Sequence, residues 1–162
     1  MPSTTSWRRV GRMTEIETPI QLQVRRTFRA PREKVFRAWT DPAMLHKWWR
    51  ASPEWSSPVA EVDLRVGGQY RLGMQAPDAD EPYVVVGEYK EIIPAEKLVY
   101  TWGWEHGGAL TQVTVEFLDH ADGTEIVLTH ENFASEAMRD EHAEGWNGCI
   151  EVLDKVLPAL DE

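Results

Sequence analysis

The feature that most constrains the fold is a series of four segments in which large apolar side chains recur at every second position. In "EKLVYTWGWEH" (96–106), the alternating residues are Tyr100, Trp102 and Trp104. Alternate side chains of a β-strand point to one face of a sheet, so these three rings share a side. The other segments span 83–94, 111–119 and 124–133. Because only short turns separate the four, they are predicted to form an antiparallel meander.

Three more strands precede the meander. "IQLQVRRTF" (20–28) alternates apolar and polar residues, as a half-buried strand does. Residues 52–58 carry two prolines and three serines and are predicted to be a loop. Val62 and Leu64 then mark one strand, and a second follows in "QYRLGMQ". Gly67-Gly68 between them suits a tight hairpin turn.

Three helices are expected. Pro31 is predicted at the first position of a short helix, and Asp41-Pro42 is a cap and first-turn pair for a second. Residues 135–160 carry apolar side chains at helical spacing, with Ser135 as N-cap and Pro158 near the end. This order predicts an α+β fold in which a curved seven-stranded antiparallel sheet encloses the long C-terminal helix. A sheet of this size curls, and one helix about 10 Å wide cannot fill a deep hollow, so a cavity is expected.

Composition narrows the functional classes. The chain has 162 residues and a net charge of −10, which disfavours binding to nucleic acid or anionic membranes. A single cysteine, Cys149, excludes an intrachain disulfide and favours a reducing compartment. No apolar run approaches the roughly 20 residues of a membrane span, and no secretory signal is evident. A cytoplasmic protein is expected. Residues 1–18 are predicted to be a disordered extension and 19–162 one domain, with translation starting at Met1 or Met13.

Five blocks of the sequence, in order, resemble the activator of heat-shock-protein-90 ATPase homologue-like family. They are "FRAPREKVFRAWTDPAMLHKWW", "VDLRVGGQYRLGM", "GEYKEIIPAEKLVYTW", "VTVEFLDHADGTEIVLTH" and "GWNGCIEVLDKVL". The resemblance covers about residues 20–160 and extends to the SRPBCC (START and birch-pollen-allergen-like) superfamily. It implies a helix-grip fold, in which a curved sheet wraps a C-terminal helix and leaves a cavity. Because the matching blocks mainly make the fold, function follows only by analogy.

The aromatic stripe is expected to divide between solid core and cavity wall. Eight tryptophans are available, and large rings suit both roles. The predicted wall consists of Trp48, Trp49, Met74, Tyr89, Tyr100, Trp102, Trp104, Val115, Leu128, His142 and Trp146. Gly145 and Gly148, on either side of Trp146, weaken a helix. A close approach of the helix to the sheet or to a ligand is expected to compensate.

Two polar residues fall on the apolar side of their strands. Arg26 and His130 are expected to lie on neighbouring strands, near each other. They are candidate polar anchors for a ligand. Alternatively, Arg26 pairs with an acidic residue such as Glu131, or a bulge turns it outward, because an unpaired buried charge is costly.

No catalytic, metal or cofactor motif is present. The five histidines lack metal-ligand spacing, and there is neither a nucleophile elbow nor a phosphate-binding loop. The leading hypothesis is therefore binding of a hydrophobic, aromatic or polycyclic small molecule. A second is a cyclase, aromatase or hydrolase acting on polyketide-like substrates, with His130 or His142 as the acid-base group. A chaperone partner is a third, which only the family resemblance implies.

Overall fold

The computed structural model describes residues 20–160. Seven strands form one sheet in the order β1-β7-β6-β5-β4-β3-β2, and every neighbouring pair is antiparallel. The elements, in chain order, are β1 (Gln21–Phe28), α1 (Arg32–Thr40), α2 (Pro42–Trp48), β2 (Ser56–Val62), β3 (Gln69–Gln75), β4 (Tyr83–Ile93), β5 (Lys97–Trp104), β6 (Thr111–His120), β7 (Gly123–Glu131), α3 (Glu136–Val156) and a 3-10 turn at Leu157–Ala159. The predicted α+β fold is confirmed. The predicted extension at residues 1–18 lies outside the described residues.

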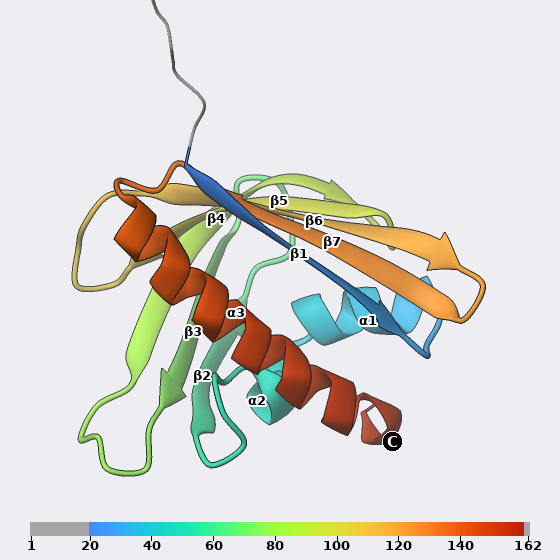
Figure 1. Cartoon of the computed structure of the whole chain (residues 1–162), viewed down its shortest axis with the longest axis horizontal. Helices are drawn as coiled ribbons and strands as arrows, with labels where there is room; N and C mark the ends of the chain where they lie inside the picture. Colours follow the sequence, from blue (N-terminus) through green and yellow to red (C-terminus); the bar gives the residue numbers. More distant parts are fainter. Residues whose placement is uncertain (1–19, 161–162) are drawn as a thin grey trace, which may run out of the picture.

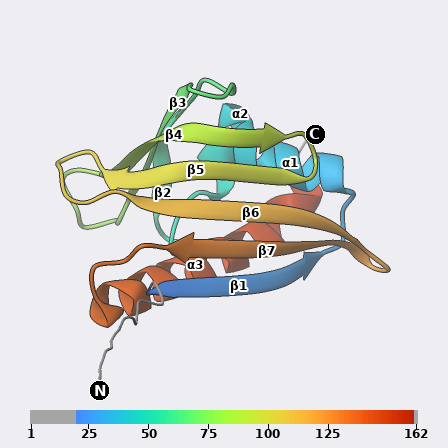
Figure 2. The ribbon, with the colours of Figure 1, turned by 90° about the horizontal axis from the view of Figure 1, so that it is seen from above.

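The sheet curls around the long helix (Figure 1). α3 runs across the concave face and packs against α2, while α1 packs against α2 and against β6 and β7. From above, the strands lie side by side over α3 (Figure 2). One continuous hydrophobic core joins the sheet to all three helices. The edge strands β1 and β2 lie at opposite ends of the strand order. α3 packs against β1, so its other side faces β2–β4.

The predicted helix caps are largely confirmed. The Asp41 side chain accepts a hydrogen bond from the Ala43 backbone N–H at 2.9 Å, and Pro42 is the first residue of α2. The Ser135 hydroxyl accepts a hydrogen bond from the Met138 backbone N–H at 3.1 Å, and Ser135 is the N-cap of α3. Pro31 differs from expectation, since it is the extended residue that caps α1 rather than its first helical residue.

The region before β3 also differs from expectation. β2 begins at Ser56, inside the predicted loop, and it ends at Val62, so Leu64 lies outside the strand and is 42% exposed. Proline is tolerated because β2 is an edge strand, where a missing N–H breaks no interior ladder. The predicted tight hairpin turn at Gly67-Gly68 is wrong, since six residues join β2 to β3. Gly67 does adopt the positive φ, of 86°, that a glycine allows.

A tyrosine and a glycine lock three strands together. Gly87 lies opposite Tyr70, whose ring passes over it, and a Cβ at Gly87 would lie 2.6 Å from that ring. This passage lets the Tyr70 hydroxyl donate a hydrogen bond to the Thr101 carbonyl oxygen at 2.6 Å. β3 is thereby tied to β5 across the intervening strand β4.

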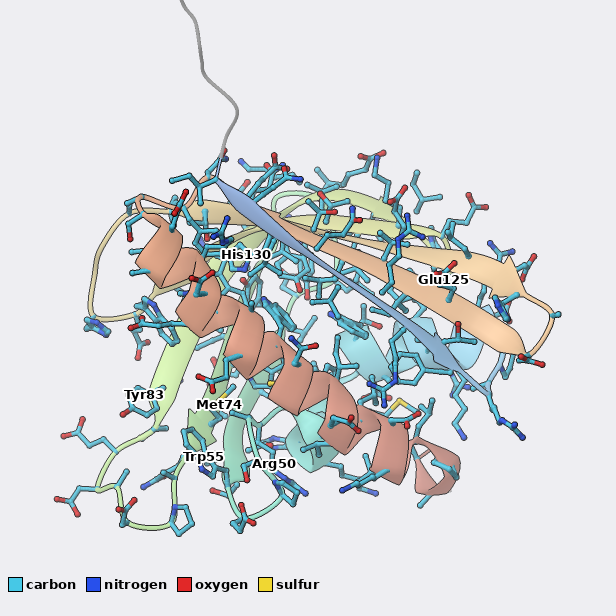
Figure 3. The ribbon with its side chains drawn as sticks, viewed as in Figure 1. Arg50, Trp55, Met74, Tyr83, Glu125 and His130 are labelled. Atoms are coloured by element: carbon cyan, nitrogen blue, oxygen red, sulfur yellow. The ribbon has the colours of Figure 1, made fainter. Side chains whose placement is uncertain are left out.

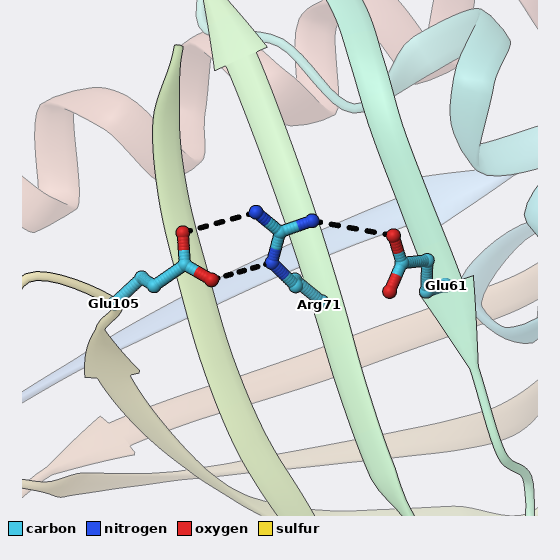
Figure 4. Close-up of polar contacts among 3 residues, drawn as sticks. All are labelled: Glu61, Arg71 and Glu105. Atoms are coloured by element: carbon cyan, nitrogen blue, oxygen red, sulfur yellow. Dashed lines mark hydrogen bonds and ion pairs between the residues drawn. The ribbon is translucent and has the colours of Figure 1, made fainter.

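Ion pairs centred on Arg71 connect β2, β3 and the end of β5 (Figure 4). Arg71 on β3 contacts Glu61 on β2 at 3.2 Å and forms a two-pronged contact with Glu105, which follows β5. Arg71 is 38% exposed, so salt screens these pairs and their contribution to stability is modest. Their geometric effect is to link the residue after β5 to β3 and β2 across the intervening strand β4.

The two helix glycines have different environments and should respond oppositely to alanine. A Cβ at Gly148 would lie 2.1 Å from the Ala51 carbonyl oxygen, whereas one at Gly145 would meet no atom within 4 Å. We expect Gly148→Ala to lower the free energy of unfolding by about 1–3 kcal/mol through overpacking. Gly145→Ala should raise it by up to about 1 kcal/mol through helix propensity. Urea denaturation of both variants measures the difference, and equal effects would contradict this account.

Candidate functional site

A pocket of about 210 Å³ lies between α3 and the concave face of the sheet. We call it the aromatic pocket. Nine residues line it: Trp49, Met74, Trp102, Trp104, Glu141, His142, Gly145, Trp146 and Cys149. Met74 and Tyr83 lie on the side of α3 that faces β3 and β4, away from His130 (Figure 3). Glu141 is exposed and Trp104, Met74 and Gly145 are half-buried, so these residues form the mouth.

The strand period of two along β5 and the helical spacing along α3 place most of these side chains in the wall of the pocket. Alternation along β5 places Trp102 and Trp104 on the concave face. On α3, His142, Gly145, Trp146 and Cys149 follow one another at intervals of three, one and three residues, which keeps them on one helix face. Trp49 comes from the residue that ends α2. Met74 comes from β3, so the site depends on four separate elements meeting.

The aromatic stripe of β5 serves both expected roles. At one end, Tyr100 is 5% exposed and packs against Tyr70 and Tyr89, with ring centroids 5.2 and 6.0 Å away. Burial raises the pKa of the Tyr100 phenol above its usual value, and the ring belongs to solid core. At the other end, Trp102 and Trp104 line the aromatic pocket. The inward face of β5 therefore changes from core to pocket wall between Tyr100 and Trp102.

Three tryptophans from three elements contact one another at the base of the pocket. The centroid of Trp102 lies 5.7 Å from that of Trp49 and 5.2 Å from that of Trp146. Trp49 and Trp146 are 5.3 Å apart and nearly perpendicular, at 70°. Tilted and edge-to-face pairs of this kind are favourable beyond the area that they bury. This contact fixes the position of the loop after α2 relative to both α3 and β5.

His130 is a buried hydrogen-bonding centre beside this cluster. Trp146 Nε1–H donates to His130 Nδ1 at 3.0 Å, so the neutral ring carries its proton on Nε2. That Nε2–H donates to Thr111 Oγ1 at 2.7 Å, and the Thr111 hydroxyl donates to the Trp102 carbonyl oxygen at 3.1 Å. Burial, with a smaller contribution from His142, lowers the pKa of His130 from 6.5 to about 3. The chain of hydrogen bonds joins α3 to β7, β6 and β5.

The two candidate polar anchors are far from each other. The strand register pairs His130 with Leu22 and Arg26 with Ile126, so the expectation that they are neighbours is wrong. Arg26 instead forms ion pairs at 3.1 Å with Glu151 and Asp154 on α3. The acids come from the helix rather than from Glu131, because the side of β1 that carries Arg26 faces α3. Neither Arg26 nor His130 lines the aromatic pocket.

The remaining predicted wall residues divide between pocket and core. Those that line the pocket are Trp49, Met74, Trp102, Trp104, His142 and Trp146. Those that lie in the core outside it are Trp48, Tyr89, Tyr100, Val115 and Leu128. Trp48, for example, is fully buried and donates its Nε1–H to the Ala38 carbonyl oxygen at 2.7 Å. Facing inward was correctly inferred for these residues, but the helix covers most of the inward face.

Sequence reasoning did not place Glu141, Gly145 and Cys149 in the wall. Their spacing around Trp146 on the helix was the available signal, and it was used only to identify the core stripe. Cys149 is 2% exposed, and burial raises the pKa of its thiol from 9.0 to about 12. The thiol is therefore protonated at neutral pH and acts as a small apolar wall residue.

Two polar groups at the pocket differ in how they are satisfied. His142 donates its Nδ1–H to the Met138 carbonyl oxygen at 2.9 Å, which leaves Nε2 of the neutral ring as an acceptor. Trp102 Nε1–H is buried and, within residues 20–160, has no acceptor. An unpaired buried donor is costly, and this nitrogen exposes almost no surface to the pocket.

Residues 20–160 contain neither a cluster of metal-ligating side chains nor a membrane-spanning helix. In this range no three His, Cys, Asp or Glu side chains are grouped so as to hold a metal ion. No helix within the same range is long and apolar enough to cross a membrane.

A curved antiparallel sheet that encloses a C-terminal helix over a pocket defines a helix-grip protein. Comparison with known families agrees, because the family described as "Activator of Hsp90 ATPase homolog 1-like protein" matches residues 29–158. The chain belongs to this family.

Solved structures give the same result. A protein from Chromobacterium violaceum is 25% identical, with a TM-score of 0.76 over 85% of this chain and 96% of the other. The AHSA1 protein from Silicibacter pomeroyi is also 25% identical, with a TM-score of 0.76 over 88% of this chain and 100% of the other. A Mycobacterium smegmatis protein is 25% identical, with a TM-score of 0.73 over 86% and 91% of the two chains. Comparison with curated proteins gives no match.

The neutral state of His130 makes a pH-dependent contribution to stability. The unfolded chain binds a proton at this residue below about pH 6.5, but the folded protein does so only near pH 3. The free energy of unfolding should therefore fall as pH drops through this window, by up to about 1.4 kcal/mol per pH unit. His130→Gln keeps one acceptor and one donor but does not titrate. In urea denaturation from pH 7 to pH 4.5, the stability advantage of the unmodified protein over this variant should shrink.

His130→Leu is the matched control for that experiment. It also removes the titrating group, but it leaves the Trp146 N–H without its acceptor, so it should be less stable than His130→Gln at pH 7. A constant difference between the unmodified protein and both variants across the pH range would contradict a neutral buried imidazole.

Trp102 and Trp48 allow wall and core to be compared directly. Trp48→Ala removes a fully buried ring and a hydrogen bond, and should lower the free energy of unfolding by about 3–5 kcal/mol. Trp102→Ala should cost less, because the ring already borders open space and its N–H has no acceptor to lose. Urea denaturation measures both. Equal losses would show that Trp102 is structural core rather than pocket wall.

Proposed function

We propose that this protein binds a small hydrophobic, aromatic molecule in the aromatic pocket, in the cytoplasm. The observation that carries the proposal is the lining, in which four tryptophans and Met74 surround about 210 Å³ of open volume. Apolar pockets with a few placed polar groups are the usual form of small-molecule sites. The Glu141 carboxylate and the His142 ring supply such groups here.

The size of the pocket limits the ligand. Sites for drug-sized molecules occupy roughly 300–1,000 Å³. At about 210 Å³, the aromatic pocket favours one or two rings over a larger polycyclic molecule.

An enzyme in the same pocket would need a general acid or base there. His130 does not suit that role, because both of its ring nitrogens are hydrogen-bonded within the protein and its pKa is about 3. His142 is the lining residue with an imidazole, so acid-base chemistry would depend on it. The geometry supports binding more directly than it supports catalysis.

The family's name refers to activation of a chaperone ATPase. That name describes relatives, and a chaperone partner for this chain rests on the name alone. The pocket is a feature of this chain's own residues, and we therefore propose the small molecule as the partner.

Filling the pocket tests the proposal. Gly145 lines the pocket and has open space beside it, so Gly145→Leu should occupy that space without disturbing the fold. We expect small aromatic molecules to quench tryptophan fluorescence and raise Tm in the unmodified protein, and to lose at least tenfold in affinity for the variant. Asn147→Leu, on the exposed side of α3, is the matched control and should bind normally. If no small aromatic molecule binds the unmodified protein, or if Gly145→Leu binds as well as the control, the proposal is wrong.

A further inference from the structure

The charge of the aromatic pocket is one-sided. Among its nine lining residues, Glu141 is the only one with a carboxylate, and none is a lysine or arginine. Glu141 lies at the mouth and is exposed. A ligand with a carboxylate would therefore enter past a like charge and would find no cation in the wall. Repulsion of this kind disfavours acidic ligands.

The rest of the chain reinforces the same sign. The protein carries 17 basic and 27 acidic residues, for a net charge of −10. A negative protein surface raises the local concentration of cations and lowers that of anions near a cleft. Both the pocket and the whole molecule thus favour a positively charged ligand.

The lining is also suited to hold a cation once it has lost its water. The faces of indole rings attract cations more strongly than those of other aromatic side chains, and four tryptophans line the pocket. Apart from Glu141 and the free His142 Nε2, the lining side chains offer few acceptors. A primary ammonium, which has three N–H donors, would remain poorly satisfied. An ammonium whose hydrogens are replaced by methyl groups has no such need and adds apolar surface.

We infer that the aromatic pocket takes a small alkylated ammonium ion, of the quaternary class, held by the tryptophan rings with Glu141 as its counter-charge at the mouth. The inference rests on the proposed function, because it specifies the ligand of the same pocket.

One arginine near the pocket argues for the opposite charge. Arg50 follows the lining residue Trp49, is half-buried, and its Nε has no partner within residues 20–160. It does not line the pocket. If the Arg50 guanidinium nevertheless formed an ion pair with the ligand, the pocket would prefer an anion. The experiment therefore includes an anionic probe.

Three probes that share a benzyl group separate charge from shape. They are benzyltrimethylammonium, its neutral carbon isostere neopentylbenzene, and phenylacetate. Affinities would be measured by tryptophan fluorescence and calorimetry at low ionic strength. We expect the cation to bind at least tenfold more tightly than the isostere, and phenylacetate to bind most weakly. Glu141→Gln should weaken binding of the cation at least fivefold and leave the isostere unaffected.

Glu144→Gln is the matched control, since it removes the same charge from α3 at an exposed position outside the pocket. It should leave all three affinities unchanged. Equal binding of cation and isostere, or equal effects of the two glutamine variants, would overturn the charge preference and leave the proposed function standing. Tightest binding of phenylacetate would overturn it in favour of Arg50. If none of the probes binds, both this inference and the proposed function fail.

Discussion

The hydrogen-bonded chain from Trp146 through His130 and Thr111 to Trp102 is the interaction on which the site depends. It connects the central turn of α3 to three neighbouring strands in a region without solvent. Each donor in the chain has a defined acceptor, so the ring of His130 has one tautomer and Trp146 has one orientation. Two walls of the aromatic pocket are thereby fixed relative to each other before any ligand arrives, which lowers the entropic cost of binding.

The pocket lies where α3 stands away from its neighbours. Where α3 approaches the loop after α2, as at Gly148 and Ala51, the contact is tight. Three residues earlier, at Gly145, there is open space beside the backbone. The rings that would otherwise fill it are held elsewhere, since Trp49, Trp102 and Trp146 pack against one another.

The fold was largely predictable from the sequence because it rests on local periods and caps. The alternation of Tyr100, Trp102 and Trp104 correctly placed three rings on one face, and Ser135 correctly marked the start of α3. Errors arose where tertiary context overrode local chemistry. Gly67-Gly68 suggested a tight hairpin turn, but the connection is longer, and β2 includes Ser56, Ser57 and Pro58, which were part of the predicted loop. An edge position makes such a strand acceptable, and strand order is not visible in a local pattern.

The sequence by itself determined which side of each strand faces inward, which segments are helical and which charge the chain carries. Only the tertiary structure decided which inward residues border open space. Tyr89 and Trp102 both face inward, yet one lies in solid core and the other lines the aromatic pocket. Likewise, Arg26 and His130 carry the same sequence signal, but one pairs with acids on α3 and the other is neutral and fully buried. The physical reason is that the period of a strand or helix fixes the direction in which each side chain points. Which residues that side chain contacts depends on where α3 crosses the sheet.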